Sequence, residues 1–84
     1  MWALTEFLFS SFDKRLAGYL LEESRRTHSL TLSTTHEQIA RNLGSAREVV
    51  SRMLKYFEKE RIVQLSRGSV KITDPARLEK ILEG

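Results

Sequence analysis

Residues 35–54 read THEQIARNLGSAREVVSRML, and the spacing of small and apolar residues in this stretch decides the fold. Ala40 is small enough to let a second helix approach the first, Gly44 follows four residues later, and Val50 follows six residues after that. Glycine permits the tight turn that a steep crossing of two helices requires. We therefore expect a helix-turn-helix unit over about residues 36–60, in which Val50 packs the second helix back onto the first.

Both expected helices have a recognisable start. Thr35 is followed three residues later by Gln38, and Ser45 by Glu48, which is the spacing of a capping box. In this motif a hydroxyl side chain and the side chain three positions later each accept a hydrogen bond from the other residue's backbone N–H. The spacing predicts that the second helix begins at Ser45, and the apolar pattern carries it to about Arg61.

Apolar residues recur at helical spacing in both helices and predict their buried faces. The residues expected to face inward are Ile39, Ala40, Leu43, Val49, Val50, Met53, Leu54 and Phe57. The opposite face of the second helix is polar, and it carries Arg47, Glu48, Ser51, Arg52 and Lys55. The second helix is therefore expected to leave a charged face free.

The sequence before this unit predicts a helix and a short strand. The helix runs to about Arg26, and Gly18 within it indicates a close packing contact. Its apolar stripe consists of Phe12, Leu16, Tyr19 and Leu20. The alternating residues 29–32 then predict a short strand.

The sequence after the unit predicts a hairpin and a last helix. Residues 62–65 and 70–73 have the composition of strands, and Gly68 between them can take the positive φ of the turn. Asp74 and Pro75 are typical of a helix start, with Asp as N-cap and Pro at the first helical position. The inward face of this helix is expected to hold Leu78, Ile81 and Leu82.

Together these elements predict an α+β fold that is mostly α. The fold is a winged helix-turn-helix, with a three-helix core, a β-hairpin wing over about residues 62–73 and a C-terminal helix. One such domain is expected over residues 11–84.

Positive charge is concentrated in the helix-turn-helix segment. The chain has 14 Lys and Arg against 11 Asp and Glu, a net charge of +3. Residues 41–61 hold six basic and three acidic residues, so this segment alone carries the whole excess. A local positive field attracts phosphate, but a solvated helix face has the same composition, and charge alone does not choose between the two readings.

The position of the charged face points to DNA. The second helix of such a unit lies in the major groove with its N-terminal residues at base edges. Arginine can bond the O6 and N7 of guanine, and a carboxylate can accept from the amino group of cytosine. The candidate base-contacting residues are Arg47, Glu48, Ser51 and Arg52. We expect Glu48 to leave its capping role for a base when DNA is bound.

Other residues are candidates for contacts to the DNA backbone. Thr34, Thr35 and Ser45 are expected to anchor phosphates with free amides at the helix starts. Lys55 lies further along the charged face. Arg67 at the tip of the hairpin and Lys71 beside it are candidate wing contacts, although a single arginine on a hairpin is as often simply solvated.

These residues and their neighbours resemble a known family. Residues 35–44 and 47–52, the opening residues 12–17 and the ending 68–78 are similar to the DNA-binding domain of the Crp–Fnr family of bacterial transcription regulators. The resemblance covers nearly everything from residue 5 onward. It implies a sequence-specific transcription regulator that reads one half of a palindromic site.

The resemblance leaves the base preference open. Arg47, Glu48 and Arg52 match the positions with which the catabolite-activator branch reads a T-G-T-G-A half-site. Glu48, Ser51 and Arg52 equally match the set of the fumarate-nitrate branch, which favours T-T-G-A-T. Both sets are present here, so the shared G-A is the better-supported part of the site.

Members of this family place an effector-sensing β-roll and a long dimerisation helix before this domain. Residues 1–10 would correspond to the end of that helix and a hinge. They include a dense apolar cluster, which fits either packing onto the core or a surface for a partner: Trp2, Leu4, Phe7, Leu8 and Phe9. The resemblance implies a homodimer in the full-length protein, an effector bound outside this chain with no cofactor in it, and RNA polymerase as a further partner.

Other function classes find little support in the sequence. His28 and His36 lack a convergent carboxylate or cysteine pattern, and there is no cysteine, Gly-rich phosphate loop or nucleophile elbow, so we expect neither an enzyme nor a metal site. No apolar run approaches the roughly 20 residues that cross a bilayer. The absence of cysteine makes a reducing cytoplasm the default, and the start lacks the features of a signal peptide, so we expect a cytoplasmic protein without membrane contact.

The remaining alternative is a winged helix used only for protein–protein contact. Such domains usually lack arginines at the start of the second helix, where this chain has Arg47 and Arg52.

Overall fold

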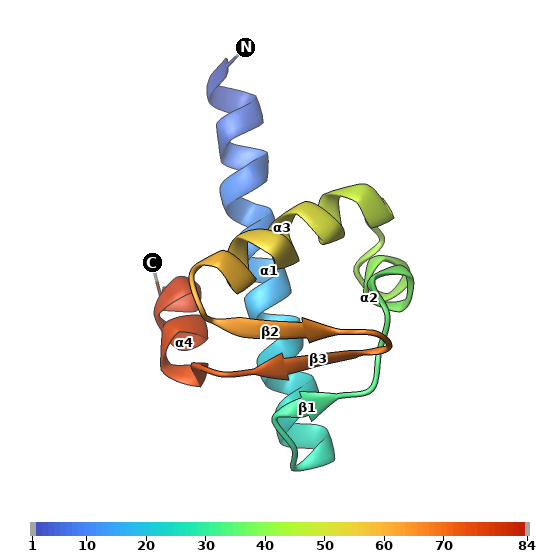
Figure 1. Cartoon of the computed structure of the whole chain (residues 1–84). Helices are drawn as coiled ribbons and strands as arrows, with labels where there is room; N and C mark the ends of the chain where they lie inside the picture. The colour runs from blue at the N-terminus through green and yellow to red at the C-terminus, as the bar shows by residue number, and fades with distance from the viewer. Residues whose placement is uncertain (1, 84) are drawn as a thin grey trace.

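The computed structural model describes residues 2–83, and describes side chains from residue 12 onward. Its elements are, in order, α1 (Trp2–Thr27), β1 (Thr31–Leu32), α2 (His36–Leu43), α3 (Arg47–Lys59), β2 (Val63–Ser66), β3 (Ser69–Ile72) and α4 (Pro75–Glu83). This is the predicted α+β winged helix-turn-helix. In Figure 1 the turn of the β2–β3 hairpin lies on the same side of the molecule as α2, and α4 lies on the opposite side.

A single apolar core joins all of these elements. Phe57 of α3 is its largest fully buried side chain. The other fully buried large side chains are Leu16, Leu20, Ile39, Val50, Met53, Leu54, Ile62, Val70, Ile72 and Leu78. Burying one such side chain stabilises the fold by about 1.5–3 kcal/mol, so residues from α1, both helices of the helix-turn-helix, the sheet and α4 hold one another in place.

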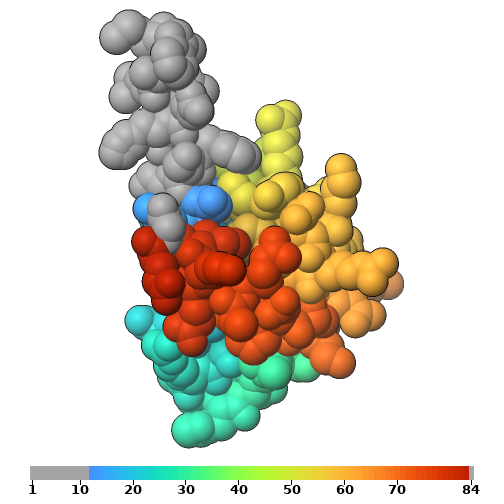
Figure 2. Space-filling model, turned by 90° about the vertical axis from the view of Figure 1, so that its left-hand side faces the viewer, coloured from blue at the N-terminus to red at the C-terminus, as the bar shows by residue number. Residues whose placement is uncertain are grey.

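The last helix packs against the first. Gly18 of α1 faces this contact, because a Cβ added there would lie 3.3 Å from Cδ2 of Leu82. Asp74 is the N-cap of α4, since its Oδ1 accepts a hydrogen bond from the Arg77 N–H at 3.2 Å. The close contact at Gly18 and the Asp74 cap were both predicted from the sequence. Figure 2 views the molecule from this side, where α4 lies across the face between α3 and the end of α1.

The sheet has three antiparallel strands in the order β1-β3-β2. In the hairpin Ser66 pairs with Ser69, so the loop consists of Arg67 and Gly68, and Gly68 has a φ of 74°. The predicted positive φ at Gly68 is confirmed. On the other side of β3, Thr31 pairs with Lys71. The hairpin is therefore anchored to β1, which directly precedes α2.

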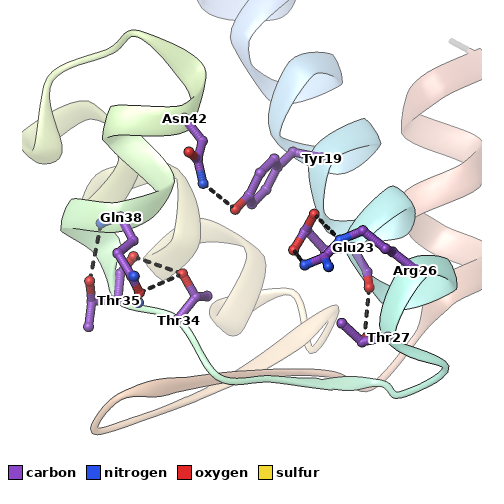
Figure 3. A network of polar contacts seen from close by, with 8 residues as sticks. All are labelled: Tyr19, Glu23, Arg26, Thr27, Thr34, Thr35, Gln38 and Asn42. Atoms are coloured by element: carbon purple, nitrogen blue, oxygen red, sulfur yellow. Dashed lines mark hydrogen bonds and ion pairs between the residues drawn. The ribbon is translucent and has the colours of Figure 1, made fainter.

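Polar contacts tie α1 to the C-terminal end of α2. The Asn42 Nδ2 donates to the Tyr19 hydroxyl at 2.8 Å (Figure 3), and the Arg15 guanidinium donates to the carbonyl oxygen of Leu43. In the same view Arg26 donates to both carboxylate oxygens of Glu23, which lowers the pKa of that carboxyl. The contacts of Asn42 and Leu43 with α1 position α2 against a long helix that is itself anchored in the core.

The predicted inward orientation is wrong for Val49, which is 38% exposed. It holds only in part for Leu82, which contacts α1 at Gly18 but is 41% exposed. The prediction for Val49 fails because the buried stripe of α3 starts at Val50. Val49 instead shares its helix face with the exposed Tyr56, seven residues later. The side chains of the predicted apolar cluster between Trp2 and Phe9 lie outside the described residues, although the backbone there belongs to α1.

Candidate nucleic-acid interface

The start of α2 is closed by its own side chains. The Thr35 Oγ1 accepts from the Gln38 N–H at 3.1 Å, and the Gln38 Oε1 accepts from the Thr35 N–H at 3.4 Å (Figure 3). This is the predicted capping box. It fixes the direction in which the chain enters α2 after β1.

The turn after α2 is a Schellman motif, and this corrects the second predicted capping box. Gly44 has a φ of 64°, its N–H bonds to the Arg41 carbonyl, and the Ser45 N–H bonds to the Ala40 carbonyl at 2.9 Å. Ser45 is thereby used to end α2. The N-cap of α3 is Ala46, without a side-chain hydrogen bond, so α3 begins at Arg47 rather than at Ser45.

The backbone amides available to a ligand also differ from those expected. The N–H groups of Thr34, Thr35 and Ser45 are bonded to Leu32, Gln38 and Ala40, respectively. Helical backbone bonding begins with Ile39 in α2 and with Val49 in α3, and the Gln38 N–H is already bonded to the Thr35 hydroxyl. The available amides are therefore those at positions 36–37 and 47–48, one to three residues later than predicted.

The polar face of α3 is exposed. The predicted base-contacting residues lie in its first two turns, with Arg47, Glu48 and Arg52 exposed and Ser51 half-buried. An Arg52 nitrogen lies 3.8 Å from a Glu48 carboxylate oxygen, and these side chains are 78% and 75% exposed. An exposed pair of this kind is weak, so both groups can turn to a new partner at little cost.

A hydrogen bond between the two helices was not predicted. The His36 Nδ1 lies 2.9 Å from the Ser51 Oγ. Partial burial lowers the pKa of His36, and the nearby charges of Arg47 and Lys55 lower it further, so the imidazole is neutral at neutral pH. The sequence identified His36 only as a surface or capping residue, because the steep crossing of α2 and α3 alone brings positions 36 and 51 together.

The tip of the wing lies beside the start of α3 and the start of α2. A shallow depression of about 350 Å³ is lined by Thr34 and Thr35 before α2, by Arg47 of α3 and by Arg67 of the wing tip. Four of the predicted contact residues, from three separate segments, therefore border one concavity. Its charges are mixed, since Glu37 lines it as well.

The structure does not bring Lys71 into that concavity. Lys71 lies in the middle of β3, on its exposed face, between Thr31 of β1 and Gln64 of β2. Lys55 lies two turns along α3 from Arg47, close enough to His36 to lower its pKa. The candidate interface therefore consists of the exposed face of α3, the start of α2 and the wing tip.

The described residues show neither a metal site nor a membrane-spanning helix. Among the side chains of residues 12–83, no three His, Cys, Asp or Glu gather as a metal ion would require. None of the helices within residues 2–83 combines the length and the apolar character needed to cross a membrane.

Comparison with known proteins identifies the domain. The family of Crp-like helix-turn-helix domains matches residues 14–81. A cyclic AMP receptor protein from Thermus thermophilus is 33% identical over 76 residues, which make up 90% of this chain and 35% of that protein.

Solved structures agree with this. A transcriptional regulator of the Crp/Fnr family from Eubacterium rectale superposes with a TM-score of 0.87 at 46% identity, covering 100% of this chain and 39% of that one. The catabolite activator protein of Thermus thermophilus superposes with a TM-score of 0.88 at 32% identity, covering 98% and 38%. This chain thus spans less than two fifths of the length of these relatives. It belongs to the family of Crp-like helix-turn-helix domains, the non-enzymatic DNA-binding domains of Crp–Fnr transcription regulators.

Proposed function

We propose that α3 enters the major groove of one half of a palindromic DNA site and reads its bases with Arg47, Glu48, Ser51 and Arg52. The observation that carries this proposal is the row that these side chains form in the first two turns of α3, three of them exposed and Ser51 half-buried. A recognition helix contacts base edges with this part of its length. Because the Arg52–Glu48 pair is weak, the two side chains can separate at little cost. Arg52 can then contact a guanine, and Glu48 can contact a cytosine.

The half-site is either T-G-T-G-A or T-T-G-A-T, by the resemblance of these four residues to the two branches of the family. Arg52 and Glu48 belong to both sets, so the G-A that the two half-sites share is assigned to them. Arg47 and Ser51 distinguish the branches. The outer bases are thus decided by which of these two side chains reaches a base.

The DNA backbone is held around this row. The hydroxyls of Thr34, Thr35 and Ser45, together with Lys55 and Arg67, contact phosphates, and Lys71 on the exposed face of β3 is a more distant phosphate contact of the wing. The concavity that joins Thr34, Thr35, Arg47 and Arg67 supports this for the wing tip and the start of α2. The amides at positions 36–37 and 47–48 are additional anion donors, because helix N-termini bind phosphate.

The full-length regulator acts as a cytoplasmic homodimer in this proposal. Its effector binds outside this domain, and RNA polymerase is a further partner. Two linked domains bind two half-sites far more tightly than one domain binds one, since the second contact is intramolecular. The isolated domain therefore binds a single half-site weakly, with a Kd of about 1 µM or weaker.

The test is a binding series on half-site DNA in which every base pair is varied. Arg52→Ala is expected to lower the preference for the G-A core by about 10-fold to 100-fold, leaving salt-dependent binding. Arg67→Ala is expected to weaken binding to all sequences alike and to lower the salt slope by about one. Lys80→Ala, which removes an exposed charge from α4 on the opposite side of the molecule, is the control. An unchanged preference in Arg52→Ala would refute the proposal.

A further inference from the structure

The Ser51 hydroxyl has one hydrogen-bond partner among the described side chains, and that partner titrates. The His36 Nδ1 lies 2.9 Å from the Ser51 Oγ, across the crossing of α2 and α3. Ser51 is half-buried on the base-reading row, while His36 is the first residue of α2 and is partly buried as well. The contact therefore links the base-reading row of α3 to a titratable side chain at the start of α2.

The direction of this hydrogen bond depends on the protonation of His36. A neutral imidazole that carries its hydrogen on Nε2 can only accept at Nδ1, so the Ser51 hydroxyl donates to it. The Ser51 oxygen then offers the groove only lone pairs. A protonated imidazole must donate from Nδ1, which leaves the Ser51 hydrogen free to point at a base.

We propose that His36 is a positioning residue for base specificity, which sets whether Ser51 acts as a hydrogen-bond acceptor or donor toward the DNA. As an acceptor Ser51 favours the amino groups of adenine or cytosine. As a donor it favours the O4 of thymine or the O6 of guanine, the acceptors that adenine and cytosine lack at these positions. This inference rests on the proposed base contact of Ser51.

The charged groups around His36 set its pKa. Arg47 and Lys55 of α3 face it, Glu37 follows it in α2, and Arg67 of the wing lines the same concavity. Burial and the two α3 cations lower the pKa of His36, so its imidazole is neutral in the free domain at neutral pH, and Ser51 takes the acceptor form with the tautomer that carries the hydrogen on Nε2. A DNA phosphate beside these cations acts in the opposite sense and raises the pKa of His36 toward neutrality.

The experiment compares base preference at two pH values. The position read by Ser51 is first found as the one whose preference changes in Ser51→Ala. In the unmodified domain, the ratio of binding with G or T to binding with A or C at that position should rise by about threefold to tenfold between about pH 8 and about pH 5. Because this is a ratio at each pH, a general gain in affinity from the added positive charge cancels.

Three variants make the result specific to His36. His36→Asn keeps a hydrogen-bonding group near the position of Nδ1 but does not titrate, and it should make the ratio independent of pH. Ser51→Ala should do the same, and it also controls for titration of the DNA. His28→Asn removes the other histidine, which lies at the end of α1 with a positive φ that Asn tolerates, and it should leave the pH response intact.

The outcomes separate this inference from the proposed function. A ratio that does not move with pH in the unmodified domain, or that moves equally in His36→Asn, overturns the inference alone. If Ser51→Ala alters no position, the base contact of Ser51 and the inference both fail. The result with Arg52→Ala then still decides whether α3 reads DNA.

Discussion

The two helices of the helix-turn-helix unit begin differently, although the sequences before them look alike. Each start has a hydroxyl residue followed three positions later by Gln or Glu. At α2 the pair closes the helix end as a capping box. At α3 the N-cap is Ala46, no side chain caps the helix, and Glu48 pairs with Arg52 instead.

This difference shows how the unit divides stability from recognition. The start of α2 is fixed locally by its own side chains. The start of α3 is fixed from outside, by the turn at Gly44 and by the burial of Val50. The side chains and amides at the start of α3 are therefore not needed for capping and remain available to a ligand.

The largest expected effect on stability is at the turn. Gly44→Ala should lower the free energy of unfolding by about 1–2 kcal/mol, because Gly44 has a φ of 64° and a Cβ is strained in that conformation. A Cβ there would meet nothing within 4 Å, so the cost is one of backbone conformation and not of packing. Urea denaturation measures it. Gly44→Asn is the matched control and should cost less, since Asn tolerates this region; equal losses would point to a different role for Gly44.

The next effect is at the start of α2. Thr35→Ala should lower the free energy of unfolding by about 1 kcal/mol, because the Gln38 N–H loses its acceptor. Thr35→Ser keeps the hydroxyl and should restore most of the loss in the same denaturation experiment. If Thr35→Ser were as unstable as Thr35→Ala, the methyl group and not the cap would be what stabilises this end.

The sequence was most informative where a signal is local. The capping box at Thr35, the Asp74 cap and the positive φ at Gly68 each depend on a few neighbouring residues, and the structure confirms all three. The Ser45 box failed because two local motifs compete for one residue. The end of α2 uses the Ser45 backbone N–H, and the N-cap of α3 is Ala46 instead of Ser45.

Features that depend on tertiary geometry could not be predicted from the pattern of neighbouring residues. The His36–Ser51 hydrogen bond joins residues 15 apart and depends on the angle at which two helices cross. Val49 was misplaced because neighbouring positions at the edge of an apolar stripe differ by a rotation of about 100° per residue, which only packing resolves. The charged row on α3 was identified correctly as a face, but its Glu48–Arg52 pair was not.

A cap can be added where the structure has none. Ala46 has a φ of −75° and a ψ of 141°, the extended conformation that an N-cap residue adopts. Ala46→Ser should therefore raise the free energy of unfolding by about 0.5–1 kcal/mol. It should also weaken DNA binding if the new hydroxyl occupies an amide that otherwise holds a phosphate. Ala46→Val lacks the hydroxyl and serves as the control; a gain in Ala46→Val would show that the added side-chain atoms, and not a cap, stabilise the helix.

The smallest effect on stability is the one that most sharply separates the two helix starts. Ser45→Ala should change the free energy of unfolding by less than about 0.5 kcal/mol, because the interaction that ends α2 uses the backbone N–H of Ser45, which alanine keeps. Binding to half-site DNA should fall, because the lost hydroxyl is a proposed phosphate contact, and it should fall alike for all sequences. A loss of stability as large as that of Thr35→Ala would mean that Ser45 caps α3 after all, and that the two helix starts are equivalent.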